Sequence, residues 1–307
     1  MKVSVDTFHP ERSIIMIEEI FFMLVFPGLL SAVFFGLLYE GIVRKVSARM
    51  QSRIGPPVWQ PFLDWIKLMS KENITPKNGV GFVMTLCPAI AFAAALSAVV
   101  FIPALGFSPA VFSGNVLMVV YLLVIYTLSF AVAGWASGSP LGSLGSIREL
   151  TLLFSYEFPF IVSLLTIGFM TSFTVSPFLA WRFPLAFLAF MACAMGSLSL
   201  PPFHVPDAEQ EIVGGPLAEY SGPRLGMFSL AHAVKFWVLI SLGAVMFLGG
   251  GPIEWFLIKS LALVLVIATA RTVFARLRID QAFRLFWLVI GPLALIDLIR
   301  AIFGIWV

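Results

Sequence analysis

The chain of 307 residues is 60% hydrophobic and only 11% charged, with a mean hydropathy of +1.01. Soluble proteins carry roughly 25% charged and 45–50% apolar residues, so this composition excludes an ordinary soluble enzyme and indicates a polytopic membrane protein. The net charge of +3 is explained by basic residues in loops on one side of the membrane and does not indicate nucleic-acid binding. The short segments of alternating hydrophobicity that are typical of a membrane β-barrel are not found.

Eight apolar runs follow one another along the chain, each about long enough to cross roughly 30 Å of hydrocarbon as a helix. Acidic residues precede the first run and no small-residue cleavage site follows it, which favours a retained span over a signal peptide. No repeat or long linker interrupts the chain, so we expect a single integral membrane domain over 1–307. The runs cover residues 15–42, 81–104, 113–136, 150–172, 181–200, 227–249, 253–274 and 281–303.

The distribution of Lys and Arg predicts the orientation of these spans, because basic residues collect in cytoplasmic loops. Seven basic residues lie in 43–80, whereas 103–113 has none. We therefore expect an all-α polytopic membrane protein with about eight transmembrane helices and both termini outside. The cytoplasmic loops are expected at about 43–80, 137–149, 201–226 and 275–280.

The segment VWQPFLDWIKLMSKE (58–72) has the spacing of an amphipathic helix. Its large apolar side chains recur every three to four residues, opposite Asp64, Lys67 and Lys71. It is too charged and too short to span, so we expect a cytoplasmic helix lying at the membrane surface.

Glu157 lies about seven residues inside the fourth run, roughly 10 Å below its start at 1.5 Å per residue. Burying a carboxylate in a membrane is costly, so such a residue is a functional candidate. Pro159 cannot donate to the carbonyl of Ser155, which leaves an acceptor beside the glutamate and favours a kink. We expect a hydrated pocket here, and the alternative is an acid paired with one base for packing alone.

The segment PFHVPDAEQEIVGGPLAEYSG (202–222) places four acids between two apolar runs, with no Lys or Arg before Arg224. Its prolines and its GGP sequence oppose a continuous helix. Apolar residues alternate with the acids, so part of the segment is expected to fold inward, where interacting acids would share protons. An exposed, solvated loop is the alternative. The four acids are Asp207, Glu209, Glu211 and Glu219.

Two further pairs of polar residues lie within apolar runs. His232 and Lys235 are one turn apart and share a helix face, so they would extend a polar path from the acids or pair with them. Asp297 and Arg300 have the same spacing, and mutual neutralisation is the favoured interpretation.

The sequence holds no motif for catalysis or metal binding. Nucleophile elbows, phosphate-binding glycine loops and HExxH are absent. Cys87 and Cys193 lie far apart inside apolar runs and are interpreted as buried small hydrophobic residues. We therefore expect no catalytic residue and no metal site within this chain.

Three stretches are similar in sequence, order and position to the motifs of one family. They are ARMQSRIGPPVWQPFLDWIKLMSKENITP (48–76), RELTLLFSYE (148–157) and PFHVPDAEQEIVGGPLAEYSGPRLGMF (202–228). Together they resemble the NuoH family, the proximal membrane subunit of respiratory complex I, over essentially the whole chain.

The resemblance implies a proton path that leads from a redox interface into the membrane, and a loop that contacts the peripheral arm. Glu157 matches the glutamate of the family's SYE motif, and the acids of 207–219 match those of its acidic loop. With the His232–Lys235 pair added from its spacing, the expected proton path comprises Glu157, Asp207, Glu209, Glu211, Glu219, His232 and Lys235. The expected contacts with the peripheral arm are Arg49, Arg53, Gly55, Pro56 and Arg148.

Departures from the family pattern narrow the resemblance. RIGPP runs almost directly into VWQP, a shortened loop similar to that of the complex-I-related membrane-bound [NiFe] hydrogenases, including formate hydrogenlyase and archaeal energy-conserving enzymes. That loop helps to frame the quinone tunnel of complex I, so its shortening counts against quinone binding. Leu152 replaces a polar residue, and Asp207 stands where the family commonly has Glu.

This form of the family implies a non-catalytic membrane anchor in the prokaryotic plasma membrane. A peripheral [NiFe]-type catalytic subunit and an iron–sulfur subunit would dock on the cytoplasmic loops and hold the [NiFe] centre and the clusters, with no cofactor in this chain. Antiporter-like membrane subunits would use the resulting bias to move ions. The alternatives are a sibling complex that reduces sulfur compounds or quinone and, more distantly, a free-standing transporter, whose half-helices or repeat symmetry are not visible.

Overall fold

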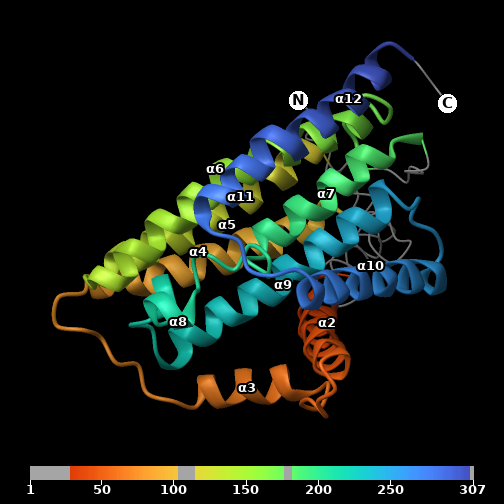
Figure 1. Cartoon of the computed structure of the whole chain (residues 1–307). Coiled ribbons are helices and arrows are strands. Elements are labelled where there is room, and N and C mark those ends of the chain that lie inside the picture. Colours follow the sequence, from red (N-terminus) through yellow and green to blue (C-terminus); the bar gives the residue numbers. More distant parts are fainter. Residues whose placement is uncertain (1–27, 103–114, 176–181, 305–307) are drawn as a thin grey trace, which may run out of the picture.

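A computed structural model describes residues 28–102, 115–175 and 182–304, and within these ranges the chain is all-α (Figure 1). The elements are α2 (Leu29–Met50), α3 (Gln60–Met69), α4 (Gly81–Val100), α5 (Val116–Ala136), α6 (Pro140–Gly168), α7 (Pro184–Ser197), α8 (Glu209–Ile212), η3 (Gly215–Leu217), α9 (Gly222–Met246), α10 (Ile253–Val273), α11 (Ile279–Leu285), the π-helical turn η4 (Phe286–Ile290) and α12 (Gly291–Ile302).

Among the described residues, six helices are long and apolar enough to cross a membrane: α4, α5, α6, α9, α10 and the stretch 279–302 that α11, η4 and α12 form. The other two expected spans differ. α7 has 14 residues, about 21 Å at 1.5 Å per residue, which is short of the roughly 30 Å of hydrocarbon. α2 has 22 residues but carries Glu40, Arg44, Lys45 and Arg49. The expected start of the first span and both chain termini lie outside the described residues.

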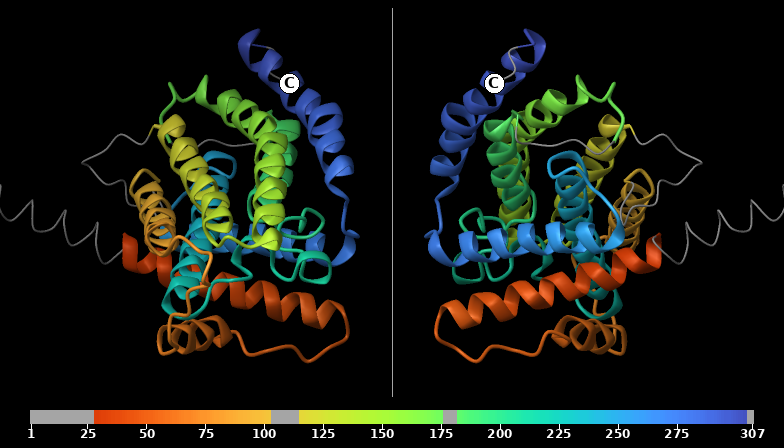
Figure 2. Two further views of the ribbon diagram at one scale, coloured as in Figure 1. Left: turned by 90° about the vertical axis from the view of Figure 1, so that its left-hand side faces the viewer. Right: turned by 90° about the vertical axis from the view of Figure 1, so that its right-hand side faces the viewer.

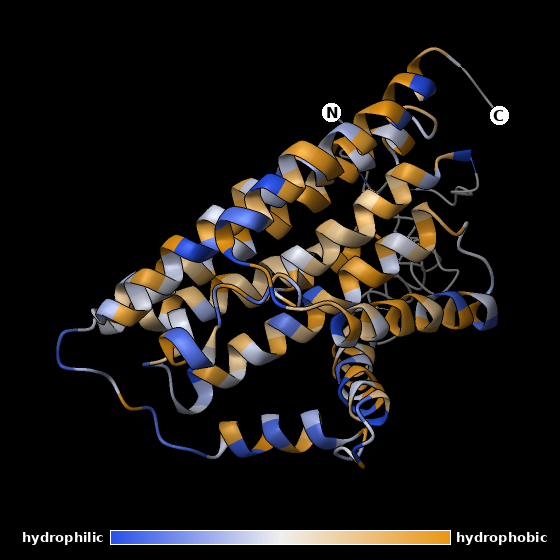
Figure 3. Cartoon of the chain, in the orientation of Figure 1, coloured by the Kyte–Doolittle hydropathy of each residue, from blue (hydrophilic) through white to orange (hydrophobic). Residues whose placement is uncertain are grey.

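α9 is the central helix of the fold. Its most apolar stretch is 89% buried, and it packs against α2, α3, α4 and α10. The ring of Trp237 stacks on Phe35 of α2 with 4.9 Å between centroids. The corresponding stretches of α10 and 279–302 are only 33% buried, and apolar residues dominate both (Figure 3). Such exposed apolar faces are the expected surface for lipid.

α2 and α10 lie side by side and run crosswise to α5 and α6 (Figure 2). α3 contacts α2 and α9, where Phe62 and Trp65 pack on a cluster that includes Leu37 and Leu230. The expected amphipathic helix is therefore confirmed, and its position at a membrane surface stays a prediction.

α6 begins at Pro140, so the helix covers most of the segment 137–149 that was expected to be a loop. Ser139 is extended and Pro140 occupies the first helical position, which is a favourable helix start. The small residues that favour a loop in the sequence serve packing instead, because a Cβ on Gly145 would collide with Gly215 and Pro216 of η3. The helix continues through Pro159 to Gly168.

The segment 201–221 connects α7 to α9 without a continuous helix, as its prolines and glycines predict. It contains only the single turns α8 and η3. Gly214 and Gly215 have φ values of +89° and +56°, a backbone conformation that glycine adopts at little cost. Both short turns pack against α6 (Figure 1).

Candidate functional site

α6 carries two acids along its length. Glu149 is 3% exposed and accepts a hydrogen bond from the Ser199 hydroxyl at 3.4 Å. Glu157 is half-buried, and its Oε1 has no hydrogen-bond partner among the described residues. Glu149 does not stand out in the sequence, because it lies at the end of the expected loop 137–149, where an exposed acid is ordinary. Its signal was the spacing of eight residues from Glu157, which places both on similar sides of a helix.

Lys235 of α9 lies opposite these acids and is 1% exposed. Its Nζ donates to the Ser197 carbonyl at 2.6 Å and to Thr127 Oγ1 at 3.3 Å. It also lies 4.4 Å from the centroid of the Tyr126 ring, a distance at which a cation is attracted to the ring face. The direct contacts of this ammonium are thus with neutral groups.

The C-terminal end of α7 meets two more basic side chains. Nε2 of His232 lies 3.3 Å from the Leu198 carbonyl, and Nδ1 of His204 lies 2.8 Å from the Ser199 carbonyl. A carbonyl only accepts, so each of these ring nitrogens carries the hydrogen. Together with the lysine, three basic side chains cover three successive carbonyls at the negative end of a helix dipole.

A cavity of about 110 Å³ lies between α5, α6, α9 and the 197–217 segment, large enough for a few water molecules. It brings together two acids and two basic groups, namely Glu149, Asp207, His232 and Lys235. Lys235 interacts electrostatically with Glu149, Glu157 and Asp207. The remaining lining residues are Tyr126, Phe130, Ser197, Ser199, Leu217, Leu225, Phe228 and Ser229.

The four acids of the 201–226 segment do not share one environment. Asp207 lines the cavity, whereas Glu211 and Glu219 are exposed at the surface. The side chain of Glu209 lies outside the described part of the structure. The acids therefore divide into an inner member and outer members.

Glu211 joins the acidic segment to two arginines. Its carboxylate lies 2.6 Å from Arg148 of α6 and 3.5 Å from Arg276, which follows α10. The hydrogen bond from Arg148, followed by the charge of Arg276, lowers the pKa of Glu211 below its ordinary value of 4.5. Glu211 is therefore ionised at neutral pH and acts as an anchor for the segment.

The residues expected to contact a peripheral arm lie at the end of α2 and just beyond it. Arg49 and Arg53 are exposed, and Pro56 is half-buried. Gly55 has φ +69°, and a Cβ there would collide with Ala48. The turn thus presents two exposed cations on a backbone shape that favours glycine.

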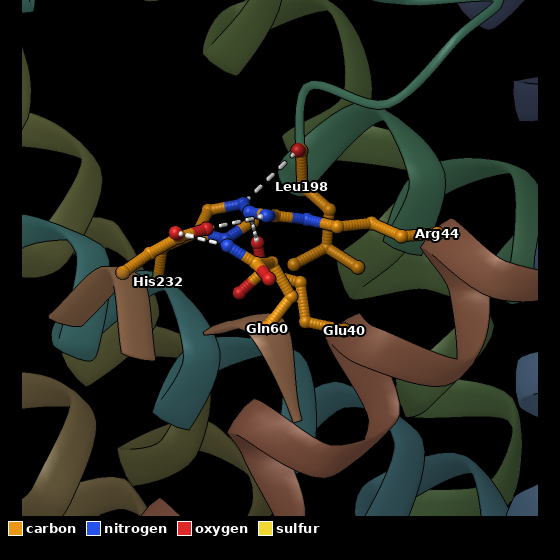
Figure 4. A network of polar contacts seen from close by, with 6 residues as sticks. Glu40, Arg44, Gln60, Leu198 and His232 are labelled. Atoms are coloured by element: carbon orange, nitrogen blue, oxygen red, sulfur yellow. Dashed lines mark hydrogen bonds and ion pairs between the residues drawn. The ribbon is translucent and has the colours of Figure 1, made fainter. Parts of the chain in front are cut away.

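An ion-pair network ties α3 to α2 (Figure 4). Arg44 bonds to Glu40 at 2.5 Å and to Asp64 of α3 at 3.1 Å, and Gln60 donates to Asp64 at 2.8 Å. The expected acid-before-base pair of Glu40 and Arg44 is present, and Asp64 extends it to a second helix.

Within the described residues, no group of three or more His, Cys, Asp or Glu side chains is arranged to hold a metal ion. Cys87 and Cys193 are buried and free, as expected of small core residues. The arrangement therefore offers proton-exchanging groups and internal water space, the components of a proton pathway.

Residues 20–302 match the profile of the NADH dehydrogenase family. This chain belongs to that family. It is 35% identical to the NuoH subunit of NADH-quinone oxidoreductase from Syntrophotalea carbinolica, over 86% of this chain and 89% of that protein. It is 33% identical to a NuoH subunit of the same enzyme from Syntrophobacter fumaroxidans, over 86% and 88% of the two chains.

A solved structure is also similar. A chain of the membrane-bound sulfane sulfur reductase, described as an archaeal respiratory membrane complex, superposes with a TM-score of 0.83 and 27% identity. The match covers 89% of this chain and 96% of that one. The family suggested by the three sequence motifs is confirmed, and the chain is a multi-pass membrane protein.

Proposed function

We propose that this chain is the membrane-anchor and proton-path subunit of a multisubunit respiratory complex in the prokaryotic cell membrane. The family relatives, named as subunits of NADH-quinone oxidoreductase, and the similar chain from an archaeal respiratory complex support this role. They also favour it over a free-standing transporter. The proposal retains about eight spans with both termini outside.

The main structural support for the proposed proton path is the cavity between α6 and α9. Two lining carboxylates, buried Glu149 and half-buried Asp207, share the cavity with the buried ammonium of Lys235. Uncompensated charge is costly there, so the site is neutral when one proton is bound to the pair of acids. Such coupled acids share that proton and release it when the nearby charge changes.

The path runs from the redox side to the membrane interior. Exposed Glu219 would exchange protons with solvent at the acidic segment, with Asp207 at the cavity wall, while the ion pairs of Glu211 would hold the segment in place. Water in the cavity would connect Asp207 to Glu149, and Glu157 lies about two turns further along α6. A peripheral redox subunit that moves or recharges the segment would bias the proton held inside.

The test is the number of protons moved per electron in membrane vesicles that contain the whole complex. Glu149→Gln and Glu157→Gln keep the side-chain size but cannot exchange a proton, so each is expected to abolish most of the coupled movement. Glu254→Gln, an exposed acid in the first turn of α10, is the matched control and should leave the ratio unchanged. An unchanged ratio of protons to electrons in both Glu149→Gln and Glu157→Gln would refute the proposed path.

The proposed partners are a peripheral [NiFe]-type catalytic subunit, an iron–sulfur subunit and antiporter-like membrane subunits. The exposed cations Arg49 and Arg53, the Gly55–Pro56 turn and Arg148 would form part of the contact with the peripheral arm. Substitution of both Arg49 and Arg53 with Gln would release the peripheral subunits at moderate salt, because exposed ion pairs are weakened by screening.

The sibling sulfur-reducing complex is the second candidate, and the structural similarity to a sulfane sulfur reductase chain specifically favours it. Metal content after purification through a tag on this chain separates the two. Nickel with abundant iron supports the hydrogenase, and abundant iron without nickel supports the sulfur-reducing complex. An intact chain that carries neither would contradict both.

A further inference from the structure

Resting on the proposed proton path, we infer that Lys235 is a specificity-determining residue that makes this path select H⁺ over Na⁺. The ammonium occupies a position whose surroundings would otherwise suit a small hydrated cation. The ammonium is a cation fixed to the protein. It excludes Na⁺ because it already occupies the position where Na⁺ would be coordinated.

The ligands around Nζ are those that transport proteins offer to Na⁺. The Ser197 carbonyl stands at the C-terminal end of α7, where the helix dipole is negative, and Thr127 adds a hydroxyl oxygen. Carbonyls at such helix ends coordinate Na⁺ in secondary transporters. The acids Glu149 and Asp207 line the same cavity and supply negative charge.

The neighbouring basic groups strengthen the exclusion. The carbonyls of Leu198 and Ser199, which follow Ser197, are taken by His232 and His204. An entering ion would therefore have to compete with a hydrogen-bond donor at each of three successive carbonyls. It would also meet the repulsion of the buried lysine, which is 1% exposed.

A proton is not subject to this exclusion. It binds covalently to a carboxylate oxygen and removes a charge, whereas Na⁺ needs several oxygen ligands and space of its own. Lys235 leaves the acids free to be protonated while it competes for every position where a metal cation would be coordinated. The lysine thus separates two ions of equal charge.

The experiment measures ²²Na⁺ bound per detergent-solubilised complex, purified through a tag on this chain, with choline replacing unlabelled salt. With Lys235 in place, Glu149→Gln should not change the amount bound, because the cavity holds no Na⁺. Lys235→Ala, which opens space beside intact oxygen ligands, should add one Na⁺ per complex. The double variant Lys235→Ala/Glu149→Gln should lose that ion. Lys235→Arg, which keeps a cation, is the matched control and should add none.

Two results would overturn the inference. One is a wild-type Na⁺ ion that disappears in Glu149→Gln, and the other is a folded Lys235→Ala complex that binds no additional Na⁺. If Lys235→Ala does not assemble, Lys235→Gln is measured in its place with the same two criteria. Na⁺ binding is measured without turnover. The result for Lys235 is therefore independent of the proton-to-electron ratio, which tests the proposed function.

Discussion

Asp297 of α12 ties two helices together, and its replacement by Asn tests how strongly charge holds α7 in position. One carboxylate oxygen accepts the backbone N–H of Ala186, in the first turn of α7, at 2.9 Å. The other accepts a hydrogen bond from Arg300 at 2.8 Å. Asp297 is 0% exposed, so water does not compete for its carboxylate oxygens in either hydrogen bond.

The size of the effect follows from these two bonds. A hydrogen bond that involves a charged group contributes about 1.5–3 kcal/mol, against about 0.5–1.5 kcal/mol for a neutral one. Asn keeps the volume and one acceptor but loses the charge on both bonds and the favourable carboxylate at the N-terminus of α7. Arg300 is 25% exposed and regains water, which limits the loss. We expect Asp297→Asn to destabilise the protein by about 2–3 kcal/mol.

Thermal unfolding of the detergent-solubilised protein measures this loss, which corresponds to a fall in Tm of about 3–5 °C. Asp280→Asn is the control, since Asp280 is an exposed acid in the first turn of α11 and should change Tm by less than about 1 °C. If Asp297→Asn also stayed within about 1 °C of wild type, the charge would not be holding α7, and the reasoning would be refuted.

Three further outcomes are expected. Gly145→Ala should lower stability by about 1–3 kcal/mol through its collision with η3, whereas Gly81→Ala, whose Cβ meets nothing within 4 Å, should not; unfolding midpoints compare them. Glu211→Gln should speed hydrogen exchange of residues 208–217. In wild type this protection should be complete above the ordinary carboxyl pKa of 4.5 and should be lost as pH falls through the lowered pKa of Glu211, because only the ionised carboxylate pairs with Arg148 and Arg276. Asp64→Asn should speed exchange in α3 alone, since Arg44 keeps its second partner.

Hydropathy predicted most of the fold because burial in lipid demands long apolar runs, and those runs are visible in one sequence. α4, α5, α9 and α10 each begin within a few residues of an expected run. α6 shows the limit of this reasoning. Its first turns are rich in small residues that suit a loop by composition, but they are needed for close contact with η3, a partner distant in sequence.

The candidate site was only partly predictable for the same reason. Glu157, Asp207 and Lys235 stood out because ionisable residues beside apolar runs are costly. Nothing local indicated that Asp207 would face the cavity while Glu211 would pair with Arg148 at the surface. The positions of these two side chains depend on how the segment packs against α6, which is distant in sequence.

The lysine contacts were likewise beyond the sequence. Spacing placed His232 and Lys235 on one face, but their acceptors are backbone carbonyls at the end of α7. A carbonyl has no sequence signature, since every residue carries one. The sequence therefore predicted which side chains were available and left their partners open.

The most direct measurement for the central claim is reaction-induced infrared difference spectroscopy of the intact complex, oxidised against reduced. A carboxyl group in the cavity that gains or loses a proton gives a band of the protonated C=O stretch, which shifts in D₂O. We expect such a band in the wild type and in Glu254→Gln, and its loss in Glu149→Gln. An unchanged band in Glu149→Gln, or no carboxyl band in the wild type, would contradict a redox-driven proton exchange in this cavity.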